Sequence, residues 1–133
     1  MIGLVIVAHG GLARELLAAT EHVVGPQPGA VAISTSPDDD LSSKQAEIDA
    51  AVASVSDGSG VVLVTDMFGG TPCNLAIGCM GEGVEVIYGA NLPMLVKLAK
   101  SRTRPLGEAA DAAIEAGRKY VDGASRMLQA KAV

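Results

Sequence analysis

Residues 2–11, IGLVIVAHGG, are the stretch from which the architecture of the chain follows. Residues 4–8 form an unbroken apolar run that favours a strand, and His9 with two glycines ends it. A continuous apolar run of this length, bounded by glycine, is typical of a strand buried on both faces of a sheet. The residues after it have helical spacing. His9 is therefore predicted at the carboxyl end of a buried strand, where ligands and chemistry gather in open α/β sheets.

The composition fits one globular domain over residues 1–133 and excludes several kinds of protein. Hydrophobic residues make up 49 % of the chain and aromatic residues only 2 %, and the formal net charge is −5. A chain of this length buries roughly two-thirds of its unfolded surface, so it needs neither metals nor disulfides to fold. The acidic balance and the lack of aromatic side chains for base stacking argue against nucleic-acid binding. Cys73 and Cys79 have neither redox nor metal-ligand spacing and are predicted to be small buried side chains.

The sequence carries no membrane or export signal. No apolar segment reaches the roughly 18 residues that a membrane-spanning helix needs. A signal peptide has a basic region before its apolar run and a cleavage signal after it. The N-terminal apolar run of this chain has neither. The protein is therefore expected in the cytoplasm.

Strands and helices alternate along the whole chain. Strands are predicted at 2–8, 30–34, 60–65 and 84–88, and helices at 12–24, 42–56, 72–80, 93–101 and 106–120. This alternation predicts a doubly wound α/β fold with four parallel strands in the order 2-1-3-4 and helices on both faces. Leu12, Leu16, Ala19 and Val23 are expected on the buried face of the first helix. The tail 125–133 fits either a helix end or a short edge strand.

Polar or glycine-rich sequence follows three of the predicted strands. His9 ends the first, Asp66 and the glycine pair 69–70 follow the third, and the loop 89–93, GANLP, follows the fourth. Because the carboxyl ends of neighbouring parallel strands meet at one edge of the sheet, His9 and Asp66 are expected to lie close together. The acidic run 38–40 after the second strand is interpreted as a solvated helix entrance rather than as a cation site.

The pairing of His9 with Asp66 has a chemical rationale. A carboxylate that accepts a hydrogen bond from Nδ1–H fixes the imidazole tautomer and leaves Nε2 free to attack. It also stabilises the positive charge that grows on the ring. Gly69, Gly70 and Thr71 would supply backbone N–H groups and a hydroxyl that cradle a phosphoryl group. The sequence contains no Walker-type motif and no acidic magnesium cluster, so no nucleotide, metal or other cofactor is expected.

Other interpretations of these residues remain open. A histidine at a strand end is often structural, an aspartate there often caps the next segment, and a glycine pair is often only a turn. Asp66 could instead be the phosphorylated residue of a receiver-type switch, although such a site needs further acidic residues and a lysine at the strand ends. The domain could also be a regulatory module that has kept only the fold. The candidates for transient docking of partners are Met67, Phe68, Asn91, Leu92 and Met94.

The chain resembles the mannose-type enzyme IIA domains of the bacterial phosphoenolpyruvate-dependent sugar phosphotransferase system. The resemblance is carried by IGLVIVAHGGLA at 2–13, TDMFGGTPCNLA at 65–76 and GANLPML at 89–95, which are spaced as in that family. It implies that His9 accepts a phosphoryl group on Nε2 from the phosphocarrier protein HPr and that Asp66 is its hydrogen-bond partner. It also implies that Thr71 and the glycines before it form the phosphoryl-binding loop.

The same resemblance implies a cytoplasmic homodimer with a fifth, antiparallel strand near the C-terminus. Because the sequence ends at Val133, no IIB domain is expected behind it. The phosphoryl acceptor would then be a separate IIB protein that serves sugar uptake, or a regulatory protein. Contact with the membrane would be indirect, through a permease complex. The phosphotransfer subunit of dihydroxyacetone kinase shares the leading strand and the histidine and is the alternative, but the FGGTP sequence favours the mannose type.

Overall fold

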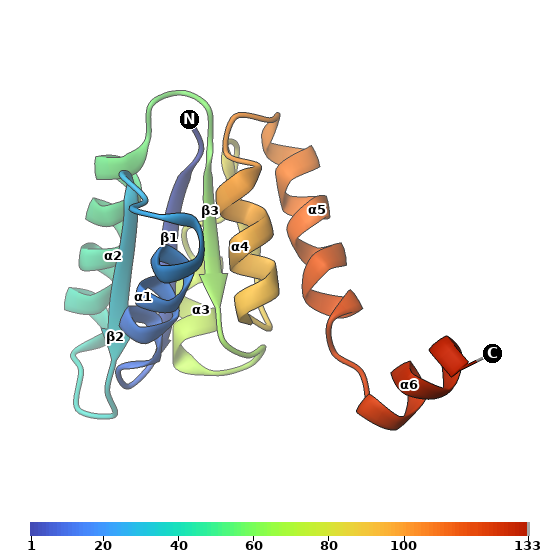
Figure 1. Ribbon diagram of the computed structural model, residues 1–133. Coiled ribbons are helices and arrows are strands. Elements are labelled where there is room, and N and C mark those ends of the chain that lie inside the picture. Colours follow the sequence, from blue (N-terminus) through green and yellow to red (C-terminus); the bar gives the residue numbers. More distant parts are fainter. Residues whose placement is uncertain (133) are drawn as a thin grey trace.

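The computed structural model describes residues 1–132, and its elements alternate as predicted (Figure 1). The strands are β1 (Gly3–His9), β2 (Ala30–Thr35), β3 (Val61–Thr65) and β4 (Val84–Ile87). The helices are α1 (Leu12–Val24), α2 (Leu41–Val55), α3 (Thr71–Ile77), α4 (Leu92–Lys100), α5 (Leu106–Lys119) and α6 (Ala124–Ala132). The helix α3 is shorter than predicted because it ends before Gly78.

The four strands form one parallel sheet in the order β2-β1-β3-β4, which confirms the predicted topology. The central strand β1 is buried from Gly3 to Ala8, and its last residue, His9, emerges from the sheet. In the register of the sheet His9 lies opposite Thr35 of β2, while Val7 lies opposite Thr65 of β3. The residue after Thr65 is Asp66. The carboxyl ends of β2 and β3 therefore lie on either side of His9, which ends β1.

Each face of the sheet has its own core. Alternate residues of β1 point to opposite faces, as the pleat of a strand requires. Leu4 and Ile6 pack with α1, α4 and α5, whereas Val5 and Val7 pack with α2 and α3. The sheet is therefore covered by helices on both faces, and the apolar core fixes the strands that carry the functional side chains.

The buried face of α1 agrees with the prediction only in part, since Leu16 packs against the core. Leu12 and Val23 are exposed, while Ala13 and Thr20 are buried. The small Ala13 side chain lies in the core that α1 shares with β1 and α4, and the hydroxyl of Thr20 donates to the carbonyl oxygen of Leu16 at 2.7 Å. That hydrogen bond satisfies the only polar group of the Thr20 side chain and lets it occupy a buried position.

The fifth strand implied by the resemblance does not appear among the described residues. The segment in question forms the helix α6, which projects from the body of the domain (Figure 1). Its sequence, ASRMLQAKA, consists mainly of good helix formers and contains no β-branched residue. The local preference therefore favours a helix in a single chain.

Candidate active site

The imidazole of His9 is held by Asp66. The Nδ1 atom of His9 lies 2.7 Å from Oδ2 of Asp66, and the backbone N–H of His9 donates to the same oxygen at 3.1 Å. The backbone N–H of Met67 donates to the other carboxylate oxygen, Oδ1, at 3.1 Å. The carboxylate is thus fixed by three donors, and the side chain of His9 is 51 % exposed while that of Asp66 is 12 % exposed. About half of the His9 side chain is therefore open to solvent.

The charge on Asp66 determines which ring nitrogen carries the proton. Burial raises the pKa of Asp66, but the hydrogen bonds from the His9 ring and backbone lower it by more, so the pKa lies below its usual value. At neutral pH the carboxylate is therefore ionised and can only accept hydrogen bonds. The contact at 2.7 Å then requires a proton on Nδ1, which leaves the lone pair of the neutral ring on Nε2.

The glycine turn lies against the reactive side of the ring. A Cβ atom on Gly70 would lie 2.8 Å from Cε1 and 3.1 Å from Nε2 of His9, so only glycine allows the imidazole to occupy this position. Gly69 has a φ of 90°, a left-handed conformation that other residues rarely adopt. Thr71 begins α3 and is exposed. The structure thus brings Gly70 to the ring as well as Asp66.

The end of β2 completes the surroundings of His9. Thr35 is buried, its hydroxyl donates to the carbonyl oxygen of Ala8 at 3.1 Å, and its own carbonyl oxygen accepts from the N–H of Gly10 at 2.8 Å. No motif in the sequence points to Thr35. Only the sheet register, which places Thr35 opposite His9, shows its relevance.

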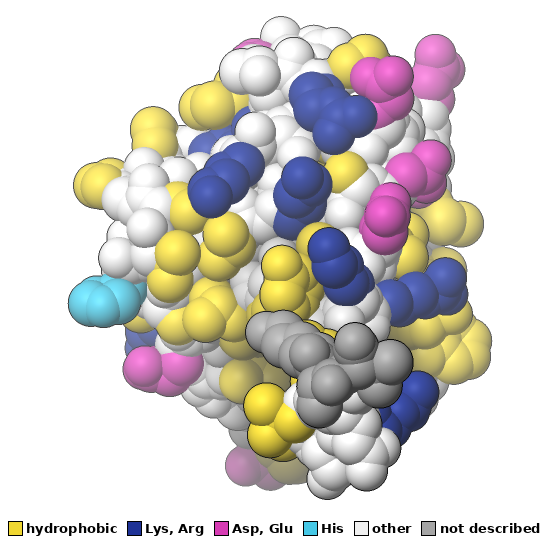
Figure 2. All heavy atoms as spheres, turned by 45° about the vertical axis from the view of Figure 1, so that its right-hand side comes forward, with side chains coloured by type: hydrophobic (Ala, Val, Ile, Leu, Met, Phe, Trp, Pro, Cys, Tyr) yellow, Lys and Arg dark blue, Asp and Glu magenta, His cyan; other side chains and the backbone are white. Residues whose placement is uncertain are grey.

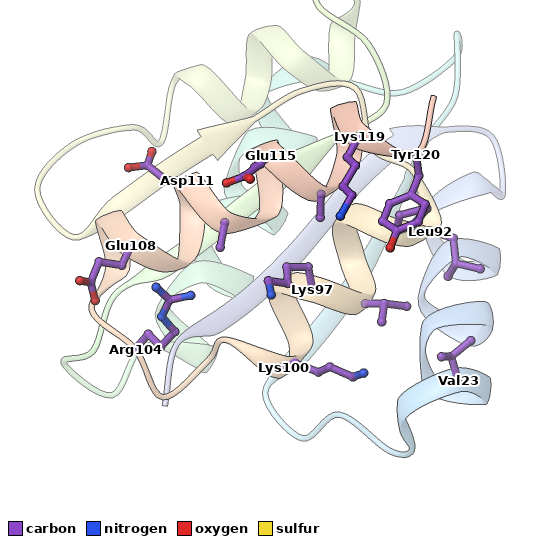
Figure 3. A pocket seen from close by; sticks show the side chains of 14 residues that line it. Val23, Leu92, Lys97, Lys100, Arg104, Glu108, Asp111, Glu115, Lys119 and Tyr120 are labelled. Carbon is purple, nitrogen blue, oxygen red and sulfur yellow. The ribbon is translucent and has the colours of Figure 1, made fainter. Parts of the chain in front are cut away.

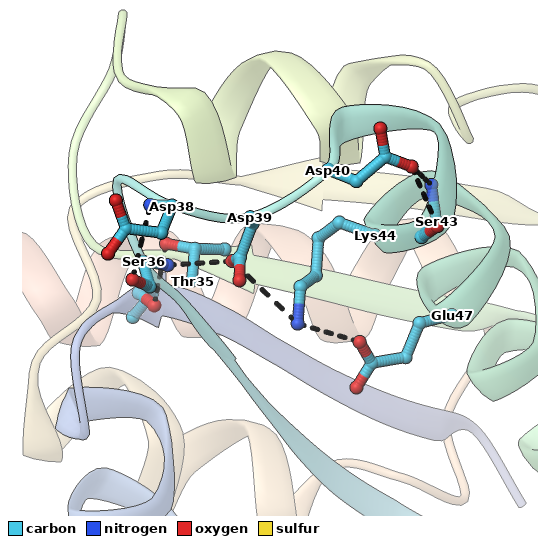
Figure 4. A network of polar contacts seen from close by, with 9 residues as sticks. Thr35, Ser36, Asp38, Asp39, Asp40, Ser43, Lys44 and Glu47 are labelled. Carbon is cyan, nitrogen blue, oxygen red and sulfur yellow. Dashed lines mark hydrogen bonds and ion pairs between the residues drawn. The ribbon is translucent and has the colours of Figure 1, made fainter.

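The acidic run 38–40 forms part of an ordered loop between β2 and α2 (Figure 4). Asp39 accepts a hydrogen bond from the N–H of Ser36 at 2.7 Å and lies 3.8 Å from the ammonium of Lys44. Asp40 caps α2 by accepting from Ser43. The hydrogen bonds from Ser43 lower the pKa of Asp40. These contacts agree with the interpretation of the run as a helix entrance.

The residues predicted to dock partners have different environments. Met67 and Phe68 are exposed beside Asp66, and the Phe68 ring lies 5.0 Å from the ring of Tyr88 at the end of β4. Their docking role remains a prediction, and Tyr88 is an exposed neighbour to which no sequence motif points. Leu92 is partly buried and lines a groove described below.

Two of the predicted docking residues have structural roles. Met94 is only 4 % exposed and packs against Gly117 of α5, so its prediction as a docking residue is wrong. Asn91 caps α4 by accepting from the N–H of Met94, and its side-chain amide donates to the carbonyl oxygen of Gly117 at 3.0 Å. Both hydrogen-bonding groups of Asn91 are therefore used within the chain. The helix cap explains why asparagine stands at position 91, and its docking role stays a prediction.

Neither cysteine has the environment of a reactive thiol. Cys73 is buried, and Cys79 is partly buried with its thiol 2.9 Å from Oδ1 of Asp49. Burial, together with the nearby carboxylate of Asp49, raises the pKa of the Cys79 thiol to about 11. In residues 1–132, no group of three or more His, Cys, Asp or Glu side chains could hold a metal ion. No helix of the described chain is long and apolar enough to cross a membrane.

A separate groove of about 810 Å³ runs along α4 and α5. Basic side chains from α4 and acidic side chains from α5 line it, with Tyr120 at one end (Figure 3). Lys and Arg side chains gather on this face of the molecule (Figure 2). Neither His9 nor Asp66 lines the groove, so it is distinct from the edge of the sheet where these two residues meet.

The fold and the site together define a doubly wound α/β protein with an oriented histidine at the carboxyl edge of its sheet. A family model described as "PTS system fructose IIA component" (EIIA-man) matches residues 3–116. The "PTS system mannose-specific EIIAB component" of Escherichia coli K12 is 33 % identical over 136 residues, which cover 99 % of this chain and 41 % of that protein. The chain thus spans less than half the length of the curated relatives that it matches.

Solved structures give the same assignment. EIIA from Streptococcus agalactiae superposes with a TM-score of 0.86 at 26 % identity, covering 95 % of this chain and 99 % of that one. The mannose/sorbose-specific IIA subunit from Enterococcus faecalis superposes with a TM-score of 0.83 at 31 % identity, covering 92 % and 93 % of the two chains. The chain belongs to the mannose-type enzyme IIA family of the phosphotransferase system.

Proposed function

We propose that the protein is a phosphohistidine relay, in which Nε2 of His9 accepts a phosphoryl group and passes it on. The lone pair of Nε2 attacks the phosphorus atom of a phosphorylated donor histidine. The new P–N bond forms as the donor P–N bond breaks, and the donor imidazole leaves with the electron pair. His9 becomes positively charged in this step, and the second transfer reverses the same chemistry on an acceptor.

The observation that carries this proposal is the hydrogen bond between Nδ1 of His9 and the ionised Asp66. It leaves the lone pair of the ring on Nε2 and places a negative charge next to the ring as the ring becomes cationic. The glycine turn that lies against the ring would offer backbone N–H groups to phosphoryl oxygens, and Thr71, which follows it, would add its hydroxyl. Catalysis here consists of positioning and charge stabilisation, as in other phosphoryl transfers.

The partners follow from the family rather than from the site. We propose phosphorylated HPr as the donor and a IIB protein as the acceptor, with a regulatory protein as the alternative acceptor. Met67 and Phe68, exposed beside the site, would contact both partners in turn. Homodimer formation is part of the proposal and is supported by the exposed Met127 and Leu128 on α6. Light scattering after size exclusion tests the dimer independently of phosphorylation.

Labelled phosphoenolpyruvate with enzyme I and HPr tests the proposed relay. The protein should become labelled, and the label should be lost in acid but retained in alkali, as for phosphohistidine. A label that alkali releases would instead assign an acyl phosphate to Asp66. The His9→Ala variant should fold and remain unlabelled, and labelling of that variant would contradict the proposal.

A further inference from the structure

We propose that Thr35 is a positioning residue for His9, because its hydroxyl fixes the peptide group from which the reactive imidazole extends. This inference rests on the proposed function of His9. Thr35 does not touch the reacting atoms. It holds the backbone on either side of His9, and the backbone in turn sets the direction in which Nε2 points.

The contacts of Thr35 bracket His9. The hydroxyl of Thr35 donates to the carbonyl oxygen of Ala8 at 3.1 Å, and its carbonyl oxygen accepts from the N–H of Gly10 at 2.8 Å. The two peptide groups that flank His9 are therefore both tied to one residue of β2. Gly10 has a φ of 56°, so the chain turns sharply directly after His9, and the ladder between the strands ends there. The hydroxyl adds a contact where a strand end would otherwise fray.

Thr35 is itself well anchored. Its side chain is buried, and the next residue, Ser36, is held by the side chain of Asp39 (Figure 4). Asp39 also lies within ion-pair distance of Lys44, which binds Glu47 at 2.7 Å on α2. The position of Thr35 is thus defined from α2 as well as from the sheet.

Two neighbouring strands hold His9 from opposite sides. Asp66, after β3, holds the N–H and the Nδ1 atom of His9, while Thr35, in β2, holds the peptide groups before and after it. The Nδ1 contact at 2.7 Å is short, and Gly70 lies so close to the other side of the ring that a Cβ atom there would meet it. A small rotation of the backbone at His9 would therefore lengthen the Nδ1 contact or press the ring against Gly70.

The test compares valine with threonine at two buried positions. Thr35→Val keeps the shape of the side chain and removes only the hydroxyl. Thr20→Val is the matched control, because the Thr20 hydroxyl also donates to a carbonyl oxygen from a buried position but lies in α1, away from His9. Thr35→Ser restores a hydroxyl, and Thr35→Cys supplies a weaker donor of similar size. This graded series keeps the test decisive if the valine variant alone fails to fold.

Two measurements separate positioning from general stability. The kcat for phosphoryl transfer from phosphorylated HPr should fall about two- to tenfold in Thr35→Val, the equivalent of one hydrogen bond, with KM for the donor unchanged. The ¹⁵N shifts of the imidazole should show a smaller fraction of the Nδ1-protonated tautomer. Thr35→Ser should recover both values, Thr35→Cys should lie between, and Thr20→Val should alter neither.

The failures of the two proposals are distinguishable. If the unaltered protein does not become phosphorylated at His9, the relay itself is wrong. If His9 is phosphorylated but kcat and the tautomer fraction of Thr35→Val match those of Thr20→Val, the relay stands and the role of Thr35 is overturned. A serine variant that behaves like the valine variant would overturn it equally.

Discussion

Replacing Asp66 by asparagine tests how the site activates His9. The carboxylate oxygen Oδ2 accepts from both Nδ1 and the backbone N–H of His9, and Oδ1 accepts from Met67. An amide has only one oxygen, so Asp66→Asn must turn its NH₂ group towards one of these sets of donors. It also removes the charge opposite the ring. A hydrogen bond to a charged group contributes about 1.5–3 kcal/mol, which corresponds to a fall in transfer rate of about 10- to 150-fold.

A Coulomb estimate sets an upper limit for this effect. Two unit charges about 4 Å apart interact by about 4 kcal/mol near a protein surface, and the half-exposed ring lies in a partly screened position. Rapid-quench measurement of phosphoryl transfer at saturating donor gives the rate directly. Asp38→Asn is the control, because it removes an exposed charge from the loop after β2 without touching His9. An Asp66→Asn rate within twofold of the unaltered protein would refute the orienting role.

Three further outcomes follow from the same geometry. Gly70→Ala should reduce phosphorylation about 100-fold while the fold persists, because the new Cβ would displace the His9 ring; Gly107→Ala, with open space around its Cβ, should leave it unchanged. Thr65→Val should leave the free energy of unfolding in urea unchanged or raise it by up to about 1 kcal/mol, because the buried Thr65 hydroxyl has no partner; a loss of stability would contradict this. The lowered pKa of Asp66 means that its stabilising contribution is present above the unfolded pKa of about 3.9 and is lost as the pH falls through the folded value. The difference in unfolding free energy between the unaltered protein and Asp66→Asn should therefore shrink from about pH 5 to about pH 3, and a difference that grows on acidification would contradict it.

The topology and the central pair of residues could be predicted from local sequence. The apolar run 4–8 is buried on both faces of the sheet, so the polar residue that follows it lies where the carboxyl ends of the strands meet solvent. Asp66 follows the neighbouring strand β3, and parallel pairing then brings it to His9. Strand periodicity and the rule that connections are right-handed are sufficient for this step. The functional roles of the two residues came from their chemistry and from the family resemblance.

The side chains that the sequence misplaced depend on tertiary packing. The local sequence around Met94 does not indicate whether its side chain is exposed or buried. The structure shows that α5 makes room for Met94 at Gly117, which has no side chain. Thr35 carries no motif, because its importance arises from the register between β1 and β2. The tail fitted two secondary structures, and the helix α6 shows which is favoured by its local sequence.

NMR spectroscopy can identify which atom of the protein carries the phosphoryl group. Protein labelled with ¹⁵N histidine is phosphorylated by enzyme I and HPr, and ¹H–¹⁵N correlations together with ¹⁵N–³¹P coupling locate the phosphoryl group. We expect one phosphoryl group on Nε2 of His9, with Nδ1 still protonated towards Asp66. Phosphate on Nδ1 of His9, on His22 or on a carboxylate would contradict it.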